Sequence, residues 1–290
     1  MIDVNFYWPW NDVKNILDGY DSKYLNVVKD KISDIGIFVD YGWPDHPICS
    51  PEKLGEQVKS LGHKYKILVM LEPQPLMIDF YRWVSDNENL FDIIFVHYTD
   101  WKGSGNNPEK YKYYNSTGDT WIDRNDRRIY TKKKNITAIF SNKNWLPGHS
   151  MRHELKRLFL DQPGVIDFNN PVNKIDGLKD YRYELVIDNE DSYIITEKCM
   201  DCFLTGTIPI IWSTKDHPQW KGYDTSGMIF FQSIEEAYDI IINNMANEEH
   251  YESSLKAIIH NFNYSIDHLG LHNVLYEQGL IELDKIVNNF

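Results

Sequence analysis

Short apolar runs alternate with polar, helix-forming stretches along most of this chain. Four apolar runs in the first half predict strands at residues 1–7, 34–39, 66–71 and 91–97. Apolar positions at helical spacing predict helices at 51–61 and 78–85. Strands that are separated by helices in this way are typical of an open α/β sheet.

The second half repeats this pattern around one well-marked block. Residues 183–187 predict a buried strand, and the polar residues 188–192 end it with turn chemistry. A helix is expected to begin at Thr196, as N-cap, and to end at Gly206; residues 207–212 then form another buried strand. A strand, a helix and a strand in this order predict a parallel pair, and ligands bind beyond the carboxyl ends of such strands.

The residues Thr196, Glu197 and Lys198 fall at that edge and carry chemistry. A helix N-terminus offers unpaired N–H groups and partial positive charge, and Lys198 adds a full charge, so the turn suits a diphosphate. Glu197 suits the hydroxyls of a ribose or a sugar. The alternative is that both are ordinary surface residues, since acidic side chains are common in the first turn of helices.

The block resembles the donor-binding motif of glycosyltransferase family 10, the α1,3/α1,4-fucosyltransferases. The family pattern is roughly Y-K-F-x-L-x-F-E-N-S, then Y-V-T-E-K, then G-x-V-P-V-Y-W-G. The matching segments here are YRYELVIDN at 181–189, IITEK at 194–198 and GTIPIIW at 206–212. Ile187 and Ile194 depart from the family's Phe and Tyr, and Asp188 replaces its Glu.

The resemblance implies a GT-B fold, an α/β arrangement of two Rossmann-like domains facing each other across a cleft. We expect an acceptor-side domain at 1–140, a nucleotide-sugar-binding domain at 141–270, and a terminal helix at 271–290 that packs back onto the first domain. The implied enzyme is an inverting hexosyltransferase of glycan biosynthesis, which transfers fucose from GDP-fucose to a hydroxyl of an acceptor glycan.

The resemblance also implies the donor-binding residues. They are expected to be Arg152, Asn189, Tyr193, Thr196, Glu197 and Lys198. Arg152, at the start of a helix predicted at 151–160, would reach the diphosphate, because a guanidinium group suits phosphate oxygens. An exposed helix arginine without a function is the alternative for Arg152.

Glu72 is the expected catalytic base. It follows the strand at 66–71 and is held between prolines, and the family has an acidic residue in a similar loop. A merely polar loop residue is the alternative, and Asp45 and Asp79 are the other candidates for the base. Trp43, Asp45 and His46 predict an acceptor-binding surface on a loop that would otherwise be only a rigid turn.

Composition limits the possible partners. The chain has 290 residues and a net charge of −13, which argues against a general nucleic-acid-binding protein. Three cysteines do not make a disulfide scaffold, and Cys199 and Cys202 are expected to pack inside a helix rather than to bind zinc. No D-x-D motif ends a predicted strand, so we expect a metal-independent reaction in which cationic side chains stabilise the diphosphate.

The sequence shows no signal peptide and no apolar stretch of about 18 residues, so we expect a soluble cytoplasmic protein of bacterial or viral type. Two other functions stay open. One is transfer from a different nucleotide sugar, which the departures at Ile187 and Ile194 allow. The other is a sugar-nucleotide-binding or glycan-binding protein without turnover. The sequence does not determine the acceptor, the linkage or the oligomeric state.

Overall fold

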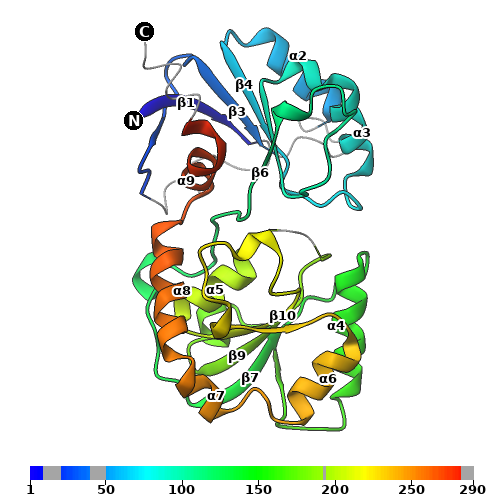
Figure 1. Cartoon of the computed structure of the whole chain (residues 1–290), viewed down its shortest axis with the longest axis vertical. Helices are drawn as coiled ribbons and strands as arrows, with labels where there is room; N and C mark the ends of the chain where they lie inside the picture. The colour runs from blue at the N-terminus through cyan, green and yellow to red at the C-terminus, as the bar shows by residue number, and fades with distance from the viewer. Residues whose placement is uncertain (9–20, 40–49, 192–193, 282–290) are drawn as a thin grey trace. The chain divides into compact units, whose positions relative to one another are not determined.

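The structure, a computed structural model, describes residues 1–8, 21–39, 50–191 and 194–281. The chain divides into two compact units (Figure 1). The first contains Met1–Thr117 and Gly270–Phe290, and the second contains Gly118–Leu269. Each is an α/β unit built on a parallel sheet.

The first unit has a six-stranded parallel sheet in the order β2-β1-β3-β4-β5-β6. Its strands are β1 (Ile2–Tyr7), β2 (Leu25–Val27), β3 (Ile35–Val39), β4 (Tyr65–Val69), β5 (Ile93–Val96) and β6 (Tyr111–Tyr113). The four predicted strands are confirmed as β1, β3, β4 and β5. β2 and β6 were not predicted, because three residues are too few to show a periodic pattern.

Two predicted helices cover the first sheet, α2 (Pro51–Ser60) and α3 (Ile78–Asn87). The Ser50 side chain caps α2 by accepting a hydrogen bond from the backbone N–H of Lys53 at 3.4 Å. Leu54 and Val58, one turn apart, enter the core against β3 and β4. Burial of such aliphatic side chains is the main stabilising contribution to each unit.

The C-terminal segment belongs to the first unit. It comprises α9 (Leu271–Leu275) and a π-helical turn (Tyr276–Leu280). The ring of Tyr276 stacks on Tyr24 with centroids 4.3 Å apart, and the Gln278 side chain accepts a hydrogen bond from the Asn115 backbone N–H at 3.0 Å. The boundary between the two units lies after Thr117, whereas the sequence predicted it at residue 140. β6 pairs with β5, so it belongs to the sheet of the first unit.

The second unit has a five-stranded parallel sheet in the order β11-β10-β9-β7-β8. Its strands are β7 (Lys134–Ile139), β8 (Asp167–Asn169), β9 (Tyr181–Val186), β10 (Ile208–Trp212) and β11 (Ile229–Phe231). β9 and β10 are parallel neighbours, with Ile208 opposite Tyr183 and Ile211 opposite Val186. The predicted strand-helix-strand block is thus confirmed.

The helices of the second unit are α4 (Pro147–Leu158), α5 (Glu197–Thr205), α6 (Ile234–Ile242), α7 (Glu248–Ser253) and α8 (Leu255–Asp267). α5 packs between the sheet and α8 (Figure 1). Cys199 and Cys202 are both buried free thiols on α5, as predicted. α4 begins four residues before the predicted Met151, because Pro147 occupies the first helical position, where proline loses no hydrogen bond.

Short 3-10 segments connect these elements at Glu88–Leu90, Pro108–Lys110, Arg124–Asp126, Lys174–Gly177, Pro218–Trp220 and Thr225–Gly227. Within the described part of the chain, no helix is both long enough and apolar enough to cross a membrane.

Substitution of Gly206 tests the requirement for glycine at the end of α5. It ends α5 with φ 70° and ψ 29°, and an added Cβ would lie 2.7 Å from the Ile129 side chain. We expect Gly206→Ala to lower the free energy of unfolding by about 1–3 kcal/mol, through left-handed strain and crowding. Urea denaturation measures this loss. Gly62→Ala is the control, because an added Cβ there meets nothing within 4 Å; equal effects of the two substitutions would contradict the prediction.

Candidate functional site

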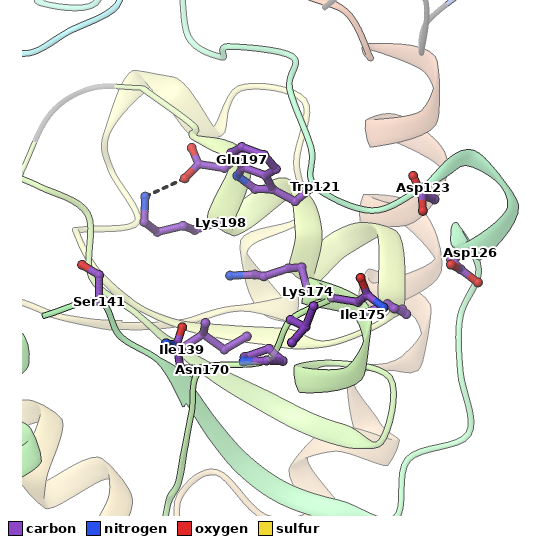
Figure 2. Close-up of a pocket in the computed structure, with 13 residues that line it drawn as sticks. Trp121, Asp123, Asp126, Ile139, Ser141, Asn170, Lys174, Ile175, Glu197 and Lys198 are labelled. Atoms are coloured by element: carbon purple, nitrogen blue, oxygen red, sulfur yellow. Dashed lines mark hydrogen bonds and ion pairs between the residues drawn. The ribbon is translucent and has the colours of Figure 1, made fainter. Parts of the chain in front are cut away.

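A pocket of about 710 Å³ lies in the second unit, at the carboxyl ends of β7 and β8 and beside the N-terminus of α5 (Figure 2). It is lined by Trp121, Asp123, Asp126, Ile139, Ser141, Asn170, Pro171, Val172, Asn173, Lys174, Ile175, Glu197 and Lys198. Pockets of a few hundred Å³ at this edge of a parallel sheet commonly hold nucleotides and other small ligands.

The N-terminus of α5 contributes a charged cluster to the pocket. Thr196 is the N-cap, as predicted, because its hydroxyl accepts a hydrogen bond from the Lys198 backbone N–H at 3.3 Å. The Lys198 ammonium group lies between two carboxylates, 2.8 Å from Glu197 and 3.2 Å from Asp188. Burial opposes the charge on Lys198, but these two carboxylates outweigh burial and raise the pKa of Lys198 above its ordinary value.

Glu197 responds in the opposite direction. Burial disfavours its charge, but the adjacent Lys198 lowers its pKa, so Glu197 is a carboxylate at neutral pH. The Asp188 carboxylate also accepts a hydrogen bond from the Thr196 hydroxyl at 2.8 Å. Of the three protons on the Lys198 ammonium, two therefore face carboxylates and one is left for a ligand.

Arg152 holds the loop that follows β9. Its Nε donates a hydrogen bond to the backbone carbonyl of Ile187 at 2.8 Å, and its Nη2 donates to the same oxygen. Nη2 also donates to Asn189 Oδ1 at 3.4 Å. Only 5% of Arg152 is exposed, and it lies in the second turn of α4 rather than at the helix start that the sequence predicted. Its Nη1 group makes no hydrogen bond among the described residues, so it is left for a ligand.

The N-terminus of α4 approaches the same loop closely. The Gly148 N–H donates to the Asn189 carbonyl at 3.0 Å, and a Cβ on Gly148 would lie 1.7 Å from the Asp188 carbonyl oxygen. Only glycine permits this approach. The buried His149 accepts the backbone N–H groups of residues 145 and 146 at Nδ1, both at 3.2 Å, so its proton lies on Nε2, and the ring interacts with the Asn189 side chain.

A buried network of acidic residues, which was not predicted from the sequence, contacts Lys174 in the wall of the pocket. Lys174, whose side chain lines the pocket, lies 3.3 Å from Glu184 on β9 and 3.9 Å from Asp201 on α5. Cys202 also donates to Glu184, at 2.9 Å. The sequence signal that could have revealed this network is the presence of Glu184 and Asp201 within otherwise apolar elements. Buried carboxylates require partners, so such residues indicate a polar network.

Asp201 fixes the segment that carries Trp121. Its Oδ1 accepts hydrogen bonds from the Thr120 hydroxyl at 2.5 Å and from the Trp121 backbone N–H at 2.8 Å. The Asp201 side chain is completely buried, whereas Trp121 is 71% exposed at the pocket. Burial, which nearby Lys174 offsets in part, raises the pKa of Asp201 to about 7.

Comparisons with known proteins identify similar structures but no similar sequence. No family model matches the sequence, and no curated protein matches it. An α-glucosyltransferase in complex with UDP-glucose and DNA containing an abasic site has a TM-score of 0.57 at 11% identity, covering 88% of this chain and 81% of that chain. The α-glucosyltransferase in complex with UDP and a 13-mer DNA containing an HMU base has a TM-score of 0.57 at 10% identity, with the same coverage.

These structures are glycosyltransferases of the GT-B type. The fold of this chain is GT-B. The predicted fold class of two Rossmann-like α/β units is therefore confirmed, and at these identities the likeness concerns the fold alone.

In this GT-B chain, the predicted base Glu72 is not among the residues that line the pocket. Glu72 lies in the first unit, after β4, where its backbone carbonyl accepts a hydrogen bond from the Tyr81 hydroxyl at 3.0 Å. The predicted acceptor residues Trp43, Asp45 and His46 and the predicted donor residue Tyr193 lie outside the described residues.

The pocket contains no evident metal centre. Among the described residues, no three His, Cys, Asp or Glu side chains come together as ligands for a metal ion. Metal independence stays a prediction of the sequence.

Asp201 predicts a pH-dependent stability. An unfolded Asp201 ionises near pH 4, so between about pH 4 and pH 7 the folded protein keeps a proton that the unfolded chain has lost. Its contribution to the free energy of unfolding is complete below this window and falls as pH rises through it. Asp201→Asn keeps an oxygen for Thr120 and Trp121 but cannot ionise.

Relative to the wild type, Asp201→Asn should therefore gain on the order of 2 kcal/mol in unfolding free energy between about pH 4.5 and about pH 7.5. Urea denaturation of both proteins at the two pH values measures this change. A difference between the proteins that is the same at both pH values would show that Asp201 does not hold the extra proton.

Proposed function

We propose that this protein is a glycosyltransferase that uses a nucleoside-diphosphate sugar as its donor. The observation that carries the proposal is the charged start of α5, which Thr196 caps and where Glu197 and Lys198 line a pocket of about 710 Å³. The GT-B fold supports it, because the structures that this chain resembles are glycosyltransferases. The pocket volume suits a ligand of nucleotide size.

In this proposal the donor diphosphate binds at the N-terminus of α5. The third proton of Lys198 and the Nη1 group of Arg152 would contact its oxygens, and the first N–H groups of the helix would add dipolar attraction. The Glu197 carboxylate would accept hydrogen bonds from the ribose hydroxyls. Asn189, whose oxygen faces Arg152, and His149 complete the polar groups around the loop after β9.

We propose GDP-fucose as the donor and a glycan hydroxyl as the acceptor. This rests on the resemblance of residues 181–212 to the fucosyltransferase motif. The competing donor is a uridine-diphosphate sugar, because one of the similar structures is a complex with UDP-glucose and because Ile187 and Ile194 depart from the motif. Those similar structures also contain DNA; the net charge of −13 makes DNA the less favoured acceptor for this chain.

The proposed reaction inverts the configuration of the transferred sugar. The acceptor hydroxyl oxygen attacks the anomeric carbon, the bond from that carbon to the diphosphate oxygen breaks, and Glu72 takes the hydroxyl proton. Lys198 and Arg152 stabilise the negative charge on the departing diphosphate. A protein that binds the donor but has no transfer activity is the remaining alternative, and the two experiments below separate it from this proposal.

Calorimetric titration with GDP, GDP-fucose, UDP and UDP-glucose tests the donor site. We expect Lys198→Ala to weaken binding of the preferred nucleoside diphosphate by about tenfold or more, since a charge-assisted hydrogen bond contributes about 1.5–3 kcal/mol. Lys156→Ala, which removes an exposed lysine of α4, is the matched control. Binding of all four ligands by Lys198→Ala at wild-type affinity would refute the proposed site, and selectivity for uridine would refute GDP-fucose.

Transfer assays test the proposed base. With the donor found by titration and an acceptor found by a glycan screen, Glu72→Gln should lower kcat by about 100-fold or more, because a general base contributes about that much. Donor affinity should stay at the wild-type value. Asp79→Asn distinguishes the other described candidate; a loss of activity in that variant and none in Glu72→Gln would assign the base to Asp79.

A further inference from the structure

Trp121 stands out because its backbone is fixed while its side chain is exposed. Its N–H is bound to the Asp201 carboxylate, and its neighbour Thr120 is bound to the same oxygen. The indole ring nevertheless is 71% exposed and, in the described part of the chain, contacts no other aromatic ring or cation. A large aromatic ring that is exposed at the edge of a pocket is a candidate ligand contact, and hydrogen bonding holds the backbone of this one in place.

The surroundings of Trp121 indicate the part of a ligand that it would meet. Figure 2 shows Trp121 and Glu197 on one side of the pocket and Ile139 and Asn170 on the opposite side. Ile139 adds an apolar surface to the side of the pocket opposite the indole. The pocket also presents Asn170 and Asn173, whose amides carry both hydrogen-bond donors and acceptors, as the edge of a nucleobase requires.

The charged groups indicate the orientation of that ligand. Glu197 and Lys198 are consecutive residues of α5, and both line the pocket that Trp121 borders. If the ribose binds Glu197 and the diphosphate binds Lys198, the base is the part that extends from Glu197 toward Trp121. An order of phosphate, ribose and base along the pocket follows from these three residues.

We propose that Trp121 is the stacking platform for the nucleobase of the donor, held in place by the buried Asp201 carboxylate. This inference rests on the proposed function and deepens it, because it names the residue that binds the base. Stacking of a base on an aromatic side chain tolerates every base, since each has a π face. Trp121 would therefore supply affinity, and the polar side chains at the edge of the pocket would select guanine or uracil.

Titration of the intact protein tests this role. We expect Trp121→Ala to bind the preferred nucleoside diphosphate about tenfold or more weakly than the wild type, and Trp121→Phe to keep most of the affinity. Inorganic pyrophosphate, which has no base, should bind both variants as it binds the wild type. Leu160→Ala is the control, because Leu160 is similarly exposed, at 66%, and does not line the pocket; it should bind as the wild type does.

The outcomes separate this inference from the proposed function. Wild-type nucleotide affinity in Trp121→Ala would overturn the platform and leave the glycosyltransferase proposal standing. An equal loss for pyrophosphate would also overturn it, because the substitution would then have disturbed the phosphate site. Failure of the wild-type protein to bind any nucleotide would overturn both. Thermal melting of each variant checks that the fold is kept.

Discussion

The site depends on one short loop that is bound by two helices. The loop is residues 187–189, immediately after β9. From α4, Arg152 binds its first carbonyl and the Gly148 N–H binds its last. From α5, Thr196 and Lys198 bind the carboxylate of its middle residue. Because both helices are tied to the same three residues, their N-termini are directed at the same edge of the sheet, and the positive ends of two helix dipoles act there together.

A network of buried ionisable residues holds together the elements that line the pocket. Glu184 on β9 and Asp201 on α5 are both buried, and Lys174 lies near both. Removing Lys174 would leave these two buried acidic residues without their cation in a region of low dielectric, where an unpaired charge is costly. The network therefore links the strand, the helix and the segment of Trp121 into one arrangement. Such supporting contacts determine how accurately a ligand is held.

Local signals made part of this structure predictable. The ends of α5 follow from Thr196, whose hydroxyl caps the helix, and from Gly206, whose left-handed backbone ends it. The predicted start of α4 was wrong, because a proline such as Pro147 is found both where a helix is interrupted and at the first position of a helix. The pocket side chains were missed for a different reason. The contact of Asp201 with Trp121 joins residues far apart in the chain, and no spacing in the sequence records it.

The charge balance of the site suggests how it handles an anionic ligand. Cationic side chains were expected to stabilise a diphosphate here, but Lys198 is already paired with Glu197 and Asp188. Under the proposed function, a diphosphate would share that ammonium group with two carboxylates and would gain less from it than from an unpaired lysine. A transferase gains from this arrangement, because a diphosphate product that is held less tightly leaves sooner, and product release limits the turnover of many such enzymes.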